Sequence, residues 1–283
     1  MFTTIISTEE LETHLADPDL VICDVRHDLT KPDSWGREQY AAGHIPGAIF
    51  VHLDTDLSAP KTGANGRHPL PTPERAAATF GRLGIARGQQ VVAYDQGGGA
   101  YAARLWWMLR WLGFQSVAVL DGGFAKWSAE GRVVSTDVTE PTPAHFDIAR
   151  VTPTVNATGV MASIPRQGLV IVDARAPERF RGEIEPLDPI AGHIPGAVNR
   201  PWGSNVSANG TFKSPTALRG EFAALLIDTP LDQVVHYCGS GVSACHNLLA
   251  MEVAGLPGTR LYPGSWSEWC ALHPELNGVS RTA

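Results

Sequence analysis

Short apolar runs rich in Val and Ile alternate along this chain with longer stretches in which apolar residues recur at helical spacing. Apolar runs of four or five residues are typical of strands buried on both faces, whereas the longer amphipathic stretches predict helices. Alternating strands and helices indicate α/β domains with parallel sheets. The predicted strands cover 20–23, 91–94, 117–120, 169–172 and 233–237, and the predicted helices cover 73–83, 101–112, 214–227 and 243–254.

Four segments of the chain occur twice, in the same order. VICDVR at 21–26 recurs as VIVDAR at 170–175, and AGHIPGA at 42–48 recurs at 191–197. VVAYD at 91–95 matches VVHYC at 234–238, and LDGGFAKW at 120–127 matches YPGSWSEW at 262–269. Such a duplication predicts two domains of similar fold. We expect an N-terminal domain at 1–138, a Pro/Thr-rich linker at 139–156 and a C-terminal domain at 157–283.

Composition and charge narrow the range of partners. The net charge is −7, charged residues make up 18% of the chain, and Lys and Arg do not cluster into long runs, so nucleic acid is not expected as a partner. No apolar stretch approaches the roughly 20 residues that span a bilayer, and the first residues do not resemble a secretory signal. We therefore expect a cytoplasmic protein that does not bind membranes.

The four cysteines, at 23, 238, 245 and 270, form no C-x-x-C pair. Their wide spacing fits neither a disulfide framework nor a zinc site, so no metal is expected. No cofactor is expected either. One reactive thiol among buried structural cysteines is the favoured interpretation.

The two copies serve as a control for each other, because residues that they share are expected to be structural. Asp24 and Arg26 match Asp173 and Arg175, and this pair is expected to hold the loop after the first strand of each copy. His44 and His193 match as well, inside GHIPG, which favours a structural histidine over a catalytic one.

The copies differ after the strand that ends at residue 94 or 237. The second copy continues with CGSGVS at 238–243, and the first with DQGGGA at 95–100. A Gly-rich loop between a strand and a helix can turn its N–H groups toward an anion. A cysteine at its start is expected to be held as a reactive thiolate. Cys238 is therefore the candidate nucleophile, whereas Asp95 leaves the first copy without one.

Two kinds of thiol chemistry fit an anion-binding loop. Phosphatase loops of the form C-x5-R clamp a phosphoryl group with their arginine, but Ala244 occupies that position here. In sulfur transfer, a thiolate takes a sulfur atom from a donor and becomes a persulfide, which N–H groups can stabilise. The loop therefore favours sulfur transfer over phosphoryl transfer.

The paired GHIPGA segments, DARxxxRF at 173–180, CGSGVS at 238–243 and GSWSEW at 264–269 resemble the tandem-domain rhodanese family over essentially the whole chain. The resemblance implies an α/β fold of two tandem rhodanese-like domains, each a parallel sheet flanked by helices, of which only the C-terminal one is catalytic. The loop is similar to CGSGV[ST] of 3-mercaptopyruvate sulfurtransferases, whereas thiosulfate-preferring members typically carry CRKGVT.

The resemblance also implies roles for single residues. Cys238 would carry the persulfide, and Arg179 would bind the anionic end of the donor. Ser240, His68 and Asp54 would form a triad that passes a proton to the pyruvate enolate. The loop residues that would surround the donor are Gly239, Gly241, Val242 and Ser243.

One departure from the family pattern concerns the cations of the site. Many 3-mercaptopyruvate sulfurtransferases carry a second arginine in an E-P-R segment, where this chain has Glu185-Pro186-Leu187. Arg181 is a candidate substitute.

Three functions follow as alternatives. The leading one is a sulfurtransferase acting on 3-mercaptopyruvate, with cyanide, a small thiol or a thioredoxin-like thiol as acceptor. The second is thiosulfate:cyanide sulfurtransferase, and the third is a silent module that binds a partner.

Overall fold

The computed structural model describes residues 1–164 and 168–276, which group into two compact units. The first unit comprises Met1–Ala59, Pro71–Thr152 and Ser207–Phe212. The second comprises Pro60–Leu70, Pro153–Val206 and the described residues from Lys213 onward. The sequence boundaries place residues 60–70 in the N-terminal domain, whereas the structure groups them with the second unit. The predicted end of the C-terminal domain, 277–283, lies outside the described residues.

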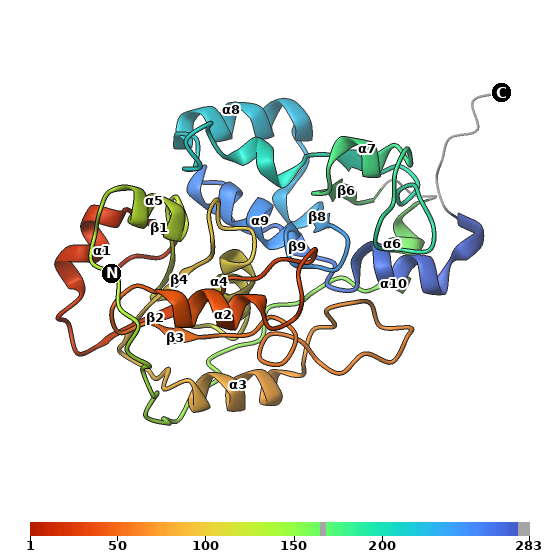
Figure 1. The fold of residues 1–283 in the computed structure, drawn as a ribbon. Helices are drawn as coiled ribbons and strands as arrows, with labels where there is room; N and C mark the ends of the chain where they lie inside the picture. Colours follow the sequence, from red (N-terminus) through yellow and green to blue (C-terminus); the bar gives the residue numbers. More distant parts are fainter. Residues whose placement is uncertain (165–167, 277–283) are drawn as a thin grey trace. The chain divides into compact units, whose positions relative to one another are not determined.

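The first unit contains a parallel sheet of five strands in the order β1-β5-β4-β2-β3, flanked by helices (Figure 1). Its longest strands are buried, as apolar runs without alternation predict. The strands are β1 (Ile5–Ile6), β2 (Leu20–Asp24), β3 (Ile49–Phe50), β4 (Gln90–Tyr94) and β5 (Val117–Leu120). The helices are α1 (Thr8–His14), α2 (Trp35–Ala42), α3 (Pro73–Arg82), α4 (Ala102–Trp111) and α5 (Gly123–Ala129).

The second unit repeats this arrangement with a parallel sheet of four strands in the order β7-β6-β8-β9. The strands are β6 (Val170–Asp173), β7 (Val198–Asn199), β8 (Val234–Tyr237) and β9 (Arg260–Leu261). The α-helices are α6 (Ala157–Ser163), α7 (Pro177–Phe180), α8 (Pro215–Leu226), α9 (Ala244–Val253) and α10 (Ser265–Leu272), and the short 3-10 helices are η2 (Trp202–Asn205), η3 (Leu231–Gln233) and η4 (Pro274–Leu276). Two α/β units with parallel sheets confirm the predicted fold class.

The residue pairs shared by both copies fix the loop after the first long strand of each unit. Arg26 binds Asp24 side chain to side chain and donates to the carbonyl of Gly43 at 2.7 Å. In the second unit, Arg175 binds Asp173 and donates to the carbonyl of Gly192, also at 2.7 Å. Both ion pairs are buried. The structural role predicted for this pair agrees with the structure.

The histidine of GHIPG packs in a similar way in the two units. His44 is buried and stacks on Tyr40, and its ring nitrogens face the carbonyls of Tyr40 and Asp137 at 2.8 and 3.0 Å. His193 stacks on Phe180 and contacts its carbonyl at 2.7 Å. These contacts fit the structural interpretation of both histidines.

The described helices include none with the length and apolar character required to cross a bilayer.

Candidate active site

Cys238 lies directly after β8, at the start of the loop that leads into α9. Its backbone is held from two directions. The N–H of Cys238 donates to the Ser265 hydroxyl at 3.1 Å, and its carbonyl accepts from the N–H of Trp266 at 3.0 Å. The next carbonyl, that of Gly239, accepts from the N–H of Ser267 at 2.9 Å. The start of α10 therefore fixes the position of the cysteine.

Ser265, which binds the N–H of Cys238, has an unusual backbone conformation. Its φ of +56° lies in the left-handed region, which residues with a Cβ rarely adopt. Its hydroxyl donates to the Tyr262 carbonyl at 3.0 Å while it accepts from Cys238. Sequence reasoning missed Ser265. The signal was present, since the equivalent residue of the first copy is Gly123, also at positive φ.

Gly241 allows the cysteine loop to approach the segment before α10 closely. Its φ is +76°, and a Cβ there would lie 2.3 Å from the Pro263 carbonyl oxygen. Glycine is therefore required at 241 for steric reasons, besides any role in binding.

The equivalent loop of the first unit shows what this backbone can bind. Asp95, at the position of Cys238, is buried, and four loop N–H groups converge on its carboxylate. Burial raises the pKa of Asp95, and the four hydrogen bonds oppose that rise. The donors are the N–H groups of Gly97, Gly99, Tyr101 and Ala102, at 3.0, 3.1, 2.8 and 3.2 Å.

The two loops follow the same path over their first four residues. The carbonyls of Asp95 and Gln96 accept from Phe124 and Ala125, just as those of Cys238 and Gly239 accept from Trp266 and Ser267. Each loop also has a left-handed glycine at its fourth position, residue 98 or 241. By position in the loop, the amides of 240, 242 and 244 correspond to three that bind the Asp95 carboxylate, although Gly99 is left-handed and Val242 is not. The duplication thus provides an internal example of an anion bound by this loop.

We expect the Asp95→Asn variant to be destabilised, although it is nearly isosteric. One oxygen would become an NH2 group facing N–H donors, and each buried donor left unpaired costs about 1–3 kcal/mol. For two such donors, the melting temperature should fall by roughly 5–15 °C. Thermal unfolding followed by circular dichroism measures this. The exposed Asp137→Asn serves as the control, and equal melting temperatures for the two variants would contradict four-fold anion binding at 95.

The structure brings His68 and Ser240 together. The Nδ1 atom of His68 lies 2.7 Å from the Ser240 hydroxyl, and both side chains are buried. The segment that carries His68 packs within the second unit, where the N–H of Arg67 donates to the Ser267 hydroxyl at 3.0 Å. Two of the three predicted triad residues are thus in hydrogen-bond contact.

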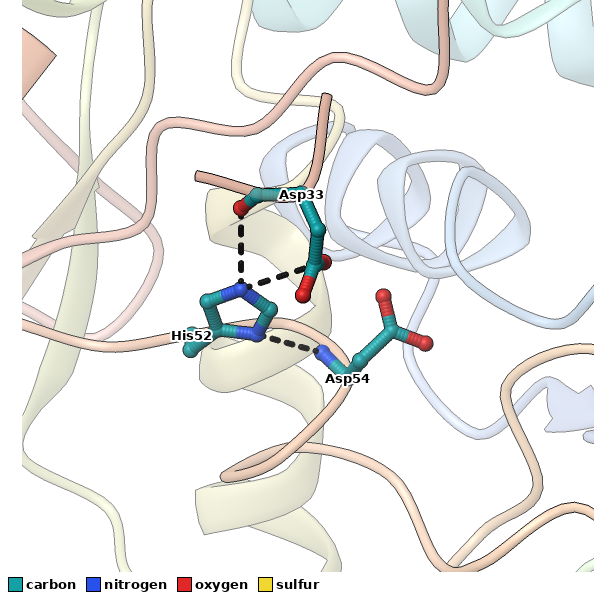
Figure 2. A group of neighbouring side chains, drawn as sticks. All are labelled: Asp33, His52 and Asp54. Carbon is teal, nitrogen blue, oxygen red and sulfur yellow. Dashed lines mark hydrogen bonds and ion pairs between the residues drawn. The ribbon is translucent and has the colours of Figure 1, made fainter. Parts of the chain in front are cut away.

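Asp54 belongs to the first unit, where it lies beside His52 and Asp33 (Figure 2). The N–H of Asp54 donates to Nδ1 of His52 at 3.2 Å. The proton of His52 is then on Nε2, which faces the carbonyl and the carboxylate of Asp33, each at 3.3 Å. His52, which sequence reasoning missed, therefore orients the backbone of Asp54.

These three residues also offer ligand atoms within 4.8 Å of one another, a spacing that a metal ion could use. However, in this tautomer Nε2 carries the proton, and the lone pair of Nδ1 already accepts from the N–H of Asp54. Neither ring nitrogen is then available to a metal. Hydrogen bonding is therefore a sufficient account of the cluster. The place of Asp54 in the triad stays a prediction.

Arg179 reaches the cysteine loop from the end of α7. Its Nη1 and Nη2 atoms lie 3.5 and 3.6 Å from the position that a Cβ on Gly239 would take. Nη2 also donates to Glu185 at 2.6 Å, and this carboxylate in turn contacts Arg175 at 3.2 Å. Arg179 thus borders the residue that follows Cys238, and its role in donor binding stays a prediction.

Arg181, the candidate for the second family arginine, has a side chain that is 54% exposed and pairs with Glu183 at 2.6 Å. The second guanidinium beside Gly239 comes instead from Arg67, whose Nη2 atom lies 2.7 Å from the Cβ position. Sequence reasoning missed Arg67, although it directly precedes His68.

The remaining cysteines are buried. Cys23 lies in β2, and burial raises the pKa of its thiol well above the ordinary value. Burial likewise raises the pKa of Cys270, to about 12. Cys245 lies in α9, and its thiol donates to the carbonyl of Gly241 at 3.3 Å. This hydrogen bond ties the cysteine loop to α9. These environments disfavour the thiolate at 23 and 270.

Comparisons with known proteins cover almost the whole chain. A Pseudomonas aeruginosa protein provisionally named a 3-mercaptopyruvate sulfurtransferase is 46% identical over 271 residues, 94% of each chain. A Mycobacterium tuberculosis protein provisionally named a thiosulfate sulfurtransferase is 43% identical, over 88% of this chain and 87% of the relative. The solved 3-mercaptopyruvate sulfurtransferase from Leishmania major superposes with a TM-score of 0.84 at 31% identity, over 97% of this chain and 76% of that one.

The family comparison agrees with the duplication. The Rhodanese-like domain family matches twice, at residues 7–130 and 157–272. The first match contains strands β2 to β5 of the first sheet, and the second match contains the whole second sheet. With relatives of this identity over this length, the chain belongs to the rhodanese-like family and carries its domain in tandem.

Proposed function

We propose that this chain is a sulfurtransferase that moves sulfur from 3-mercaptopyruvate to a thiol or cyanide acceptor through a persulfide on Cys238. The observation that carries the proposal is the pair of equivalent loops. In one, four amides bind the carboxylate of Asp95. In the other, a cysteine takes the place of that aspartate. Such a loop suits a sulfur anion at the same point.

The proposed reaction has two steps. The Cys238 thiolate attacks the sulfur of 3-mercaptopyruvate, the S–S bond forms, and the C–S bond breaks. The electron pair of the C–S bond leaves as the enolate of pyruvate, which then takes a proton. In the second step, the acceptor attacks the outer sulfur, and Cys238 returns as a thiolate. No electrons are required from a cofactor.

The surroundings of Cys238 support this donor. The contact between His68 and Ser240 offers a proton source for the enolate. Transfer from thiosulfate needs no such proton source, because its leaving group is sulfite. Arg179 suits a single carboxylate, and the loop has Gly239 and Ser240 where thiosulfate-preferring members carry cations. The names of the relatives in Pseudomonas and Leishmania point to the same donor.

Thiosulfate is the second candidate donor, because the Mycobacterium tuberculosis relative is provisionally named for it. The persulfide would be the same, and only the leaving group would differ. A silent partner-binding module is the third alternative, and the cysteine loop argues against it.

The test compares the two donors on the same protein. Incubation with 3-mercaptopyruvate should add the mass of one sulfur atom to the peptide that contains Cys238. We expect kcat/KM for cyanide-dependent turnover to be at least about tenfold higher with 3-mercaptopyruvate than with thiosulfate. A clear preference for thiosulfate would refute the assigned donor, and sulfur loading from neither donor would favour the silent module.

A further inference from the structure

Gly239 lies against two guanidinium groups that come from different segments of the second unit. A Cβ on this residue would be 2.7 Å from Nη2 of Arg67, and 3.5 and 3.6 Å from the two Nη atoms of Arg179. Both cations therefore border the residue that directly follows the proposed nucleophile. The side chains of Arg67 and Arg179 keep 23% and 16% of their surface exposed, so they are neither fully buried nor free in solvent.

One buried carboxylate lies between the two arginines. Asp188 forms an ion pair with Arg67 through one oxygen and faces Nη2 of Arg179 at 3.4 Å through the other. Its side chain is 3% exposed. Asp188 thus holds the two guanidinium groups in a fixed arrangement at Gly239.

Arg67 retains unused binding capacity in this arrangement. Its Nε atom is buried and has no hydrogen-bond partner among the described residues. A buried donor without a partner is costly unless a ligand or water satisfies it. The backbone of Arg67 is anchored by the hydrogen bond to the Ser267 hydroxyl, so its side chain starts from a fixed point. Planar guanidinium groups are suited to binding carboxylates through two parallel hydrogen bonds.

We propose that Arg67 binds the carboxylate of the sulfur donor together with Arg179, and so supplies the second arginine that position 187 lacks. This inference rests on the proposed function, since it names the donor-binding groups of the same site. It assigns the role to Arg67 rather than to Arg181, which is exposed and paired with Glu183. The ligand class is a small 2-oxo acid.

The first test is the Arg67→Gln variant. Its KM for 3-mercaptopyruvate should rise about tenfold to a hundredfold, because a charge-assisted pair of hydrogen bonds is lost. Its kcat should change by no more than about threefold, since the carboxylate does not react and is bound equally in the ground and transition states. Arg67→Lys keeps the charge without the planar guanidinium, so its KM should lie between those of the parent protein and Arg67→Gln. Arg181→Gln, the matched control, should leave both constants unchanged.

A second variant tests the geometry without removing the arginine. The methyl group of Gly239→Ala would displace the Nη2 atom of Arg67, which is the far end of a flexible side chain. KM should rise in the parent protein but not further in the Arg67→Gln background. An equal rise in both backgrounds, or an Arg67→Gln variant whose KM matches that of Arg181→Gln, would overturn the proposal.

Pyruvate binding separates this inference from the proposed function. Pyruvate carries the carboxylate but no sulfur, so calorimetric titration reports on Arg67 even if no sulfur transfer is detected. We expect Arg67→Gln to weaken pyruvate binding at least about tenfold. If the parent protein binds pyruvate and loads no sulfur, only the proposed function fails. If parent and variant bind pyruvate equally, or neither binds it, the role of Arg67 fails.

Discussion

Replacing Cys238 by serine should abolish sulfur transfer from every donor. A serine hydroxyl is a far weaker nucleophile toward sulfur and cannot carry a persulfide, so turnover should fall by at least about 10⁴-fold. The fold should persist, because the backbone of residue 238 is held by Ser265 and Trp266 and not through its side chain. Turnover to cyanide measures the loss of sulfur transfer, and the intact mass after donor treatment shows whether the variant still gains a sulfur atom.

Cys270→Ser provides the matched control for this variant. Cys270 is also buried and lies in the second unit, but burial raises the pKa of its thiol to about 12. Its serine variant should keep the parental rate and still gain the mass of one sulfur atom. If Cys238→Ser still gained that mass while Cys270→Ser did not, the nucleophile would have been assigned to the wrong cysteine.

The sheet could be predicted from the sequence wherever a strand is long and buried. The runs at 91–94 and 117–120 correspond to β4 and β5 within one residue, because every position faces apolar neighbours. The strands β1, β3, β7 and β9 have only two residues each, and such a length carries no periodic signal. They form because a neighbouring strand offers hydrogen bonds, which local sequence does not reveal.

Residues brought together by long-range packing were harder to predict. The Arg67–Asp188 pair joins positions 121 apart, and the bond between Arg67 and Ser267 joins positions 200 apart. No local pattern encodes such contacts. His68 could be named only through family resemblance, and the same resemblance said nothing about its neighbour Arg67. The departure at Leu187 indicated that a cation was missing, but only the structure showed another one beside Gly239.

The duplication explains how a candidate nucleophile could be proposed from the sequence. Both copies need the same loop path to join a parallel strand to the next helix, so the turn and its left-handed glycine recur. Selection for structure alone does not require the first residue of the loop to be cysteine or aspartate. Asp95 accepts hydrogen bonds from the loop amides with its own carboxylate, whereas Cys238 has no carboxylate to take that place. The difference between the copies is therefore what singles out Cys238 as the candidate nucleophile.

Replacing His68 by glutamine should separate the two donors. Sulfur transfer from 3-mercaptopyruvate leaves an enolate that needs a proton, and Nδ1 of His68, 2.7 Å from the Ser240 hydroxyl, can restore the proton that Ser240 gives. Loss of a positioned acid–base group typically costs about 10²–10⁴ in rate, so kcat for this donor should fall by that factor. Transfer from thiosulfate releases sulfite, and its rate should stay within about threefold of the parent, since no proton transfer is removed.

Steady-state kinetics with both donors measures this separation on one protein sample. Ser240→Ala should show the same selective loss, and the exposed His145→Gln should behave as the parent with either donor. An equal loss with both donors would mean that His68 supports the loop mechanically and takes no part in proton transfer. Unchanged turnover of 3-mercaptopyruvate in both His68→Gln and Ser240→Ala would exclude the proton relay, because each variant removes one of its two members.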